Sequence, residues 1–129
     1  MVYSGKSVSD LKIAYIGGGS RGWAWGLMSD LAREHSMKGE VVLYDIDFEA
    51  AKHNEIIGNK ICVDHPDANK WTYRAEENID KALTGADFVI ISILPGTFDE
   101  MHSDVHAPEK YGIYQSVGDT VGAGGCIRA

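Results

Sequence analysis

The chain has 129 residues, of which 44% are hydrophobic and 24% charged, and its formal net charge at pH 7 is -7. This length suits one domain with a modest core, and the composition is typical of a soluble globular domain. The negative charge disfavours nucleic acid and anionic membrane surfaces, and no apolar run approaches the roughly 20 residues of a membrane span. Because residues 1–10 lack an apolar signal core, we expect a cytoplasmic protein.

Apolar runs alternate with helix-like stretches along the chain. In order, the patterns predict a strand at 11–16, a helix at 20–35, a strand at 40–45, a helix at 47–61, a strand at 71–75, a helix at 78–83 and a strand at 86–94. Apolar strands separated by helices indicate a parallel sheet that is covered on both faces. The sequence therefore predicts the α/β class, with an incomplete Rossmann-like doubly wound sheet of about four strands.

Two tryptophans lie in the first predicted helix. Trp23, Leu27 and Leu31 share one helical face, with Ala24 and Met28 beside it. Because residues two apart face different ways on a helix, we expect one tryptophan to meet the core and the other a partner element or a missing part of the protein.

The stretch YIGGGSRGWAWG contains G-x-G-x-x-G directly after a strand and at the start of a helix. In a dinucleotide site, Gly17 would permit the tight turn, Gly19 the approach to a pyrophosphate, and Gly22 the close packing of helix on strand. The free N–H groups of the helix would face the anion. The alternative is a glycine-rich turn that binds nothing.

An acid and a cation accompany this loop. Asp45, at the end of the next predicted strand, would accept hydrogen bonds from the adenosine ribose and repel a 2′-phosphate, so NAD is favoured over NADP. Arg21 either pairs with the pyrophosphate or is simply solvated.

Two further motifs lie near the C-terminal end of the sequence. His102 and His106 would share a helical face and, with Asp99, could bind zinc, but a solvated helix face is favoured, because no HExxH glutamate is present. The stretch 115–125, with Asp119 and Thr120, is either a flexible connection or a ligand-lining loop at the carboxyl end of the sheet. We expect Cys62 and Cys126 to be reduced thiols.

The segments KIAYIGGGSRGWAWGLMSDLA, YDIDFEAA, GADFVIISILPG and EKYGIYQSVGDTVGAGGCIRA together resemble the NAD-dependent family 4 glycoside hydrolases. Within that family they are similar to the branch of α-galacturonidases and α-galactosidases. The resemblance covers residues 11–129, with Ala123 replacing a proline expected in this branch. It implies that residues 1–129 are the NAD-binding N-terminal part of a longer enzyme.

The resemblance implies an unusual reaction. NAD oxidises the sugar at C3, the glycosidic bond eliminates, water adds and the hydride returns, while manganese polarises the C2 and C3 oxygens. In this family the metal ligands, the acid and the base lie further along the chain. We therefore expect the catalytic residues beyond Ala129 and no metal site within residues 1–129.

The resemblance also implies which residues form the site. At the pyrophosphate it suggests Gly17, Gly18, Gly19, Ser20, Arg21 and Gly22. It suggests Asp45 at the ribose; Ile93, Leu94, Pro95 and Gly96 beside the dinucleotide; and Asp119 and Thr120 near the sugar and nicotinamide. Members that act on phospho-sugars carry an arginine after the fourth strand, and TFDEMHSDVH has none. An unphosphorylated galacturonide or galactoside is therefore the expected substrate.

Two other classes remain open. One is a hydroxyacid dehydrogenase of the lactate or malate type, with its histidine and arginine downstream, and the other is a non-catalytic NAD-binding module. Independently of the function, the strand at 86–94 would leave an apolar edge, because the fifth strand of a doubly wound sheet is missing from this sequence. We expect Phe88–Ile93 to be covered by residues 112–129, by downstream residues, or by a second copy in a homo-oligomer.

Overall fold

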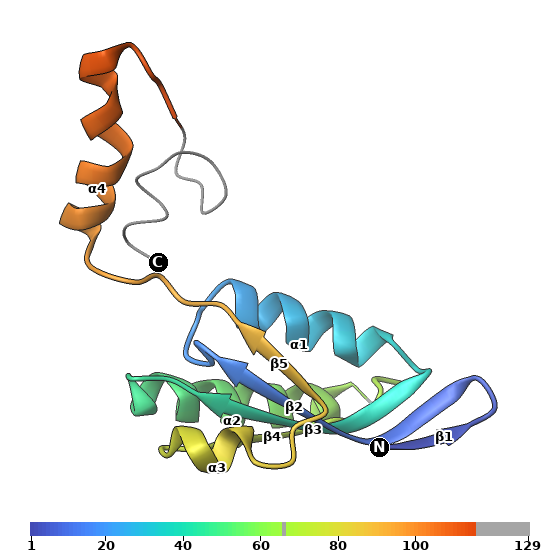
Figure 1. Ribbon diagram of the computed structural model, residues 1–129. Helices are drawn as coiled ribbons and strands as arrows, with labels where there is room; N and C mark the ends of the chain where they lie inside the picture. The colour runs from blue at the N-terminus through green and yellow to red at the C-terminus, as the bar shows by residue number, and fades with distance from the viewer. Residues whose placement is uncertain (66, 116–129) are drawn as a thin grey trace. The chain divides into compact units, whose positions relative to one another are not determined.

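The computed structural model describes residues 1–65 and 67–115. The chain divides into two compact units, Met1–Ile93 and Leu94–Ala129. The elements of the first unit are β1 (Val2–Ser4), β2 (Ser7–Ile16), α1 (Trp23–Arg33), β3 (Met37–Tyr44), α2 (Phe48–Asp64), β4 (Thr72–Ala75), α3 (Ile79–Leu83) and β5 (Phe88–Ile91) (Figure 1).

The first unit is built on a five-stranded sheet. β2 pairs in parallel with β3 and β5, and β3 pairs in parallel with β4, so the four parallel strands have the order β4-β3-β2-β5. Numbered along the chain, this is the 3-2-1-4 half of a doubly wound sheet. The predicted α/β, Rossmann-like fold is confirmed.

β1 was not predicted. It pairs antiparallel with the start of β2, so the sheet is mixed, and the turn between them contains Gly5 at φ 62°. This hairpin lengthens β2 toward the N-terminus. A register shift between Val8 and Leu11 interrupts the parallel pairing of β2 with β3, and Asp10 in this stretch has φ 57°.

One face of the sheet packs against α1 and α2 in a single core. Alternate strand residues and the inner faces of the two helices form it: Leu11, Ile13, Tyr15, Ala24, Met28, Leu31, Val41, Leu43, Ala51, Trp71 and Tyr73. The expectation that one of the two tryptophans of α1 meets this core is wrong, because Trp23 is 79% exposed and Trp25 43% exposed. The helix instead turns Ala24 toward the sheet, and with it Met28 and Leu31.

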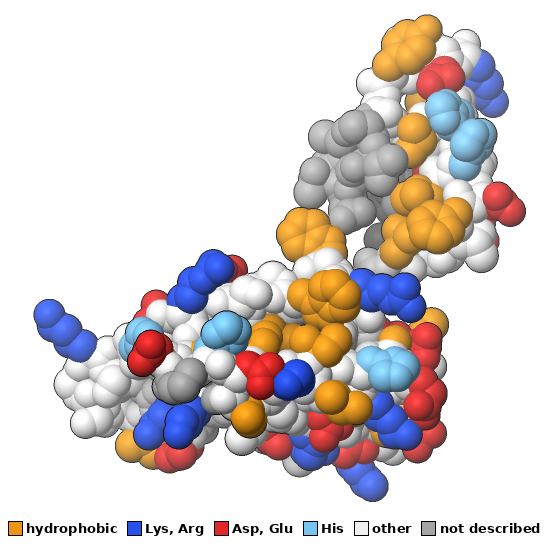
Figure 2. All heavy atoms as spheres, turned by 180° about the vertical axis from the view of Figure 1, so that it is seen from behind, with side chains coloured by type: hydrophobic (Ala, Val, Ile, Leu, Met, Phe, Trp, Pro, Cys, Tyr) orange, Lys and Arg blue, Asp and Glu red, His pale blue; other side chains and the backbone are white. Residues whose placement is uncertain are grey.

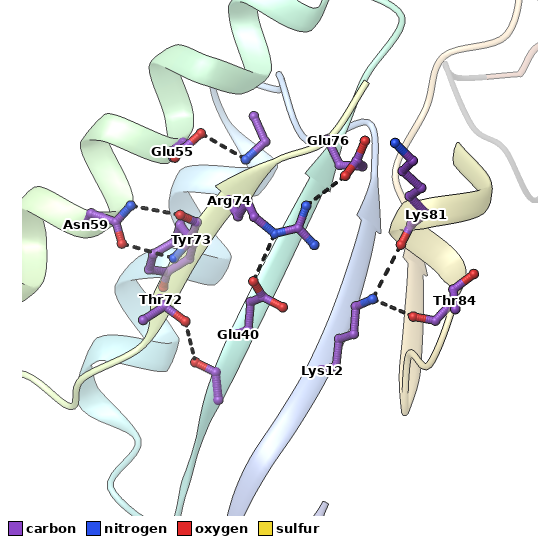
Figure 3. Close-up of polar contacts among 12 residues, drawn as sticks. Lys12, Glu40, Glu55, Asn59, Thr72, Tyr73, Arg74, Glu76, Lys81 and Thr84 are labelled. Atoms are coloured by element: carbon purple, nitrogen blue, oxygen red, sulfur yellow. Dashed lines mark hydrogen bonds and ion pairs between the residues drawn. The ribbon is translucent and has the colours of Figure 1, made fainter. Parts of the chain in front are cut away.

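The opposite face of the sheet carries charged side chains (Figure 3). Arg74 lies between two acids: its Nε is 3.0 Å from Glu40 Oε1 and its Nη1 is 2.8 Å from Glu76 Oε2. Lys12 donates to the carbonyls of Lys81 and Thr84 at the end of α3. A cation near a helix C-terminus interacts favourably with the helix dipole, so Lys12 helps to fix α3 over this face.

β5 is shorter than the predicted strand and pairs only with β2 among the described residues. Phe88, Val89 and Ile91 are 55%, 50% and 69% exposed. Among the described residues of the first unit, β5 therefore has a strand on one side only, which does not test our expectation of a covered strand. Cover by residues beyond 115 or by a second copy stays a prediction.

The second unit contains α4 (Phe98–His106) and the 3-10 helix η1 (Ala107–Tyr111). A capping box of Thr97 and Glu100 begins α4, and Gly112 at φ 75° ends η1.

The face of the protein opposite to that of Figure 1 carries side chains of several kinds. Figure 2 shows acidic, basic and hydrophobic side chains interspersed on the face seen from behind. Within the described ranges, no helix has both the length and the apolar character needed to cross a membrane.

Candidate functional site

The glycine loop, residues 17–22, joins the end of β2 to the start of α1. Gly17 has φ 93°, and a Cβ on it would lie 1.9 Å from the Ser92 carbonyl oxygen that follows β5. A Cβ on Gly18 would lie 2.7 Å from Leu43 Cβ in β3. The loop therefore passes directly over the ends of two parallel strands, and the predicted tight turn at Gly17 is confirmed.

Asp45 lies against this loop from the end of β3. Its Oδ2 accepts a hydrogen bond from the Gly19 N–H at 2.8 Å, and its Oδ1 accepts one from the Asp47 N–H at 3.0 Å. A Cβ on Gly19 would lie 2.7 Å from Ala50 Cβ and 2.9 Å from Asp45 Oδ2, so a side chain at this position would force its neighbours to shift. Each carboxylate oxygen has a second lone pair, so ribose hydroxyls could still donate to Asp45.

Gly22 does not have its predicted role. It caps α1, and a Cβ there would find no atom within 4 Å. The close packing of this loop on a strand occurs at Gly18 instead. Sequence spacing alone could not distinguish the two, since the exact path of the loop decides which glycine approaches the sheet.

Some backbone N–H groups of the loop donate hydrogen bonds within the protein, whereas others are open, that is, without an acceptor among the described residues. Those of Gly17 and Gly18 donate to the Tyr44 carbonyl, and that of Ser20 donates to the Gly17 carbonyl. Within the described part of the chain, the N–H groups of Arg21 and Gly22 donate to no protein atom. The Arg21 side chain is exposed and the first turn of α1 has no acid, so this end of the helix can accept an anion.

Sequence reasoning missed Asn54, a residue of α2 whose side chain is 2% exposed. Its Nδ2 donates to the carbonyls of Gly18 at 2.7 Å and Ser20 at 3.0 Å, and its Oδ1 accepts from Trp25 Nε1 at 2.7 Å. The available signal was its spacing: Ala51, Asn54 and Gly58 form one buried stripe of α2. An amide in such a stripe needs partners.

Trp25 thus meets a partner element, α2, as expected for one of the two tryptophans. Trp23 borders an open hollow of about 700 Å³ beside the loop. The hollow lies between α1 and β5 and is lined by Tyr15, Gly22, Trp23, Gly26, Leu27, Asp30, Ile90 and Ser92.

The remaining predicted residues differ in where they lie. Ile93 is near the loop, since its Cγ2 is 3.3 Å from the position of a Cβ on Gly17. Leu94, Pro95 and Gly96 belong to the second unit, and their role stays a prediction. Asp119 and Thr120 lie outside the described residues.

The histidine pair of α4 lies beside one acidic side chain. The rings of His102 and His106 are 4.3 Å apart, and His106 Nδ1 is 2.8 Å from Glu109 Oε1. Among residues 1–65 and 67–115, no three His, Cys, Asp or Glu side chains are grouped so that they could hold a metal ion.

The parallel order, the glycine turn after the first parallel strand and the acid after the second define a Rossmann-like α/β domain. The chain belongs to family 4 of the glycosyl hydrolases, whose family model matches residues 12–129.

Three relatives illustrate this membership. An α-galacturonidase of Thermoanaerobacterium saccharolyticum is 67% identical over 129 residues, which are 100% of this chain and 28% of that protein. The crystal structure of lplD from Bacillus subtilis, described as a glucosidase, is 58% identical, with a TM-score of 0.76 over 93% of this chain and 26% of that one.

The third is the 6-phospho-beta glucosidase of Thermotoga maritima with manganese, NAD+ and glucose-6-phosphate. It is 28% identical, with a TM-score of 0.67 over 89% of this chain and 27% of that one. This chain therefore spans less than a third of the length of each relative.

Proposed function

We propose that this chain is the NAD-binding N-terminal part of a longer glycosidase that cleaves an unphosphorylated galacturonide or galactoside. The observation that carries the proposal is the glycine loop held against Asp45, with 2.8 Å between Gly19 N and Asp45 Oδ2. Family membership favours this function over a hydroxyacid dehydrogenase with a similar fold.

The residues of the loop fit a dinucleotide. The open N–H groups of Arg21 and Gly22 and the Arg21 guanidinium would hold the pyrophosphate. Asp45 would hold the adenosine ribose, and its negative charge would disfavour the 2′-phosphate of NADP. The bound nicotinamide cofactor of the Thermotoga maritima relative supports the same assignment.

The proposed reaction begins at the sugar. The bound cofactor would supply an oxidation at C3, which permits elimination of the glycosidic bond, addition of water and re-reduction. Manganese would polarise the C2 and C3 oxygens. We propose that its ligands, the catalytic acid and the base lie outside the described residues.

Two observations support the choice of substrate. The relative that is 67% identical is an α-galacturonidase. Residues 97–106, TFDEMHSDVH, contain three acidic residues and two histidines but no arginine that could pair with a sugar phosphate. We further propose a cytoplasmic homo-oligomer, and the exposed apolar edge of β5 supports the second part of that proposal.

An activity panel on the full-length protein tests the function. Nitrophenyl galacturonides, galactosides and their 6-phosphorylated forms would be offered with NAD, manganese and a reductant. We expect cleavage of an unphosphorylated substrate that depends on added NAD in the cofactor-free protein. Cleavage of phosphorylated substrates alone, or full activity without NAD, would contradict the proposal.

A further inference from the structure

Asn54 uses every part of its buried amide on groups that surround the glycine loop. Two donors go to the carbonyls of Gly18 and Ser20, and the acceptor receives the Trp25 indole N–H. Leaving any of these groups buried without a partner would be costly, so the three bonds fix one arrangement of the loop.

The orientation of the amide follows from its partners. Both loop partners are carbonyl oxygens, so only the amide NH2 can face them. The indole N–H of Trp25 is a donor only, so it must face the amide oxygen. Trp25 therefore selects the orientation of Asn54 that holds the loop.

The geometry of the peptide bond carries this constraint to the other side of the loop. No cis peptide bond occurs in the described chain, and in a trans peptide the C=O and the following N–H point in opposite directions. When Asn54 holds the Gly18 and Ser20 carbonyls toward α2, the N–H groups of Gly19 and Arg21 point away from it. The Gly19 N–H meets Asp45, whereas the Arg21 N–H is open.

We infer that Asn54, oriented by Trp25, is a positioning residue that aims the Arg21 N–H at the pyrophosphate of the dinucleotide. This inference rests on the proposed function, because it concerns how tightly NAD binds. Asn54 touches no ligand in this scheme and acts through the backbone of the loop.

The test compares Asn54 with Asn59, a matched asparagine of the same helix. Asn59 binds the backbone of Tyr73 in β4, with its Nδ2 2.8 Å from the Tyr73 carbonyl and its Oδ1 3.0 Å from the Tyr73 N–H. Asn54→Leu, Asn54→Asp and Asn59→Leu would be made in the full-length protein. NAD affinity would be measured by calorimetry and the opening of backbone amides by hydrogen exchange.

We expect Asn54→Leu to raise the NAD dissociation constant by roughly tenfold to a hundredfold, because two loop bonds are lost. Asn54→Asp should be weaker still, since its carboxylate faces two carbonyl oxygens. Both should speed exchange of the hydrogen-bonded amides of residues 17–20. Asn59→Leu should speed exchange in β4 and change NAD affinity less than about threefold.

Trp25→Phe provides the milder form of the same test if the Asn54 variants do not fold. It removes one N–H from a side chain that is 43% exposed, and it should weaken NAD binding by about threefold to tenfold. Unchanged affinity in Trp25→Phe or in a folded Asn54 variant, or an equal loss in Asn59→Leu, would overturn the inference. If the unaltered protein bound no NAD, the proposed function itself would fail instead.

Discussion

Gly17 and Gly22 belong to one motif, yet the structure predicts opposite responses to the same substitution. In Gly17→Ala the new Cβ would lie 1.9 Å from the Ser92 carbonyl oxygen, whereas real Cβ contacts are essentially never under 3.0 Å. The end of β5 would have to move by about 1 Å or more. Overpacking of this kind costs about 1–3 kcal/mol, and a positive φ adds roughly 1–2 kcal/mol for an L-residue.

Gly17→Ala should therefore lower the free energy of unfolding by about 2–5 kcal/mol, a large share of a typical total of about 5–15 kcal/mol. Gly22→Ala adds its methyl group where no atom lies within 4 Å, at φ -106°. Its better helix propensity and poorer capping nearly offset each other, so the change should stay within about 1 kcal/mol.

Native-state hydrogen exchange of β2 and β3 amides in the full-length protein gives the local free energy of opening for each variant. The difference in the free energy of opening between the two alanine variants is the informative quantity, because both variants carry one additional alanine in the same loop. If Gly17→Ala proved as stable as the unaltered protein, or Gly22→Ala as damaging as Gly17→Ala, the described path of the loop would be wrong.

Three further predictions follow from other parts of the first unit. Asp45→Ala should weaken NAD binding more than NADP binding, and calorimetry giving the same ratio of the two affinities before and after the change would remove Asp45 from the ribose site. The pKa of Glu76 is lowered, first by the hydrogen bond from the Asn78 backbone N–H and then by Arg74, so its stabilising effect is present above the ordinary glutamate pKa of about 4.3 and lost as the pH falls through the lowered value. In Glu76→Gln the free energy of unfolding, measured with urea, should accordingly fall less steeply as the pH is lowered through the acidic range. The same pH dependence as in the unaltered protein would contradict this linkage. Phe88–Ile91 amides should exchange slowly in the full-length protein, because another strand, segment or copy covers the edge, and exchange as fast as that of surface loops would refute the covered edge.

The fold was predictable because its signals are local. The apolar strand runs and the polar stretches between them indicated the order of elements. Asp47 and Asn78, the first residues of two predicted helices, cap α2 and α3. The β1 hairpin escaped prediction because residues 2–9 carry no strong alternating pattern. The position of β1 in the sheet follows from its antiparallel pairing with β2, and the periodicity of a sequence does not specify which strands pair.

The candidate site was predictable only in part. The glycine spacing and the acid after β3 identified Gly17 and Asp45, since both follow from the ends of predicted strands. The burial of a tryptophan of α1 was predicted wrongly because a small rotation of the helix about its own axis decides which residues face the sheet, and sequence periodicity does not fix that rotation. Asn54 was missed because its partners are backbone carbonyls 34 and 36 residues away, and such contacts leave no local pattern.

A crystal structure of the full-length protein with NAD is the most direct test of the central claim. We expect the pyrophosphate to lie against the N–H groups of Arg21 and Gly22, with the adenosine ribose hydrogen-bonded to Asp45 and the Asn54 contacts to the loop unchanged. NAD bound away from the glycine loop, or a loop whose carbonyls have left Asn54 in the complex, would contradict the account.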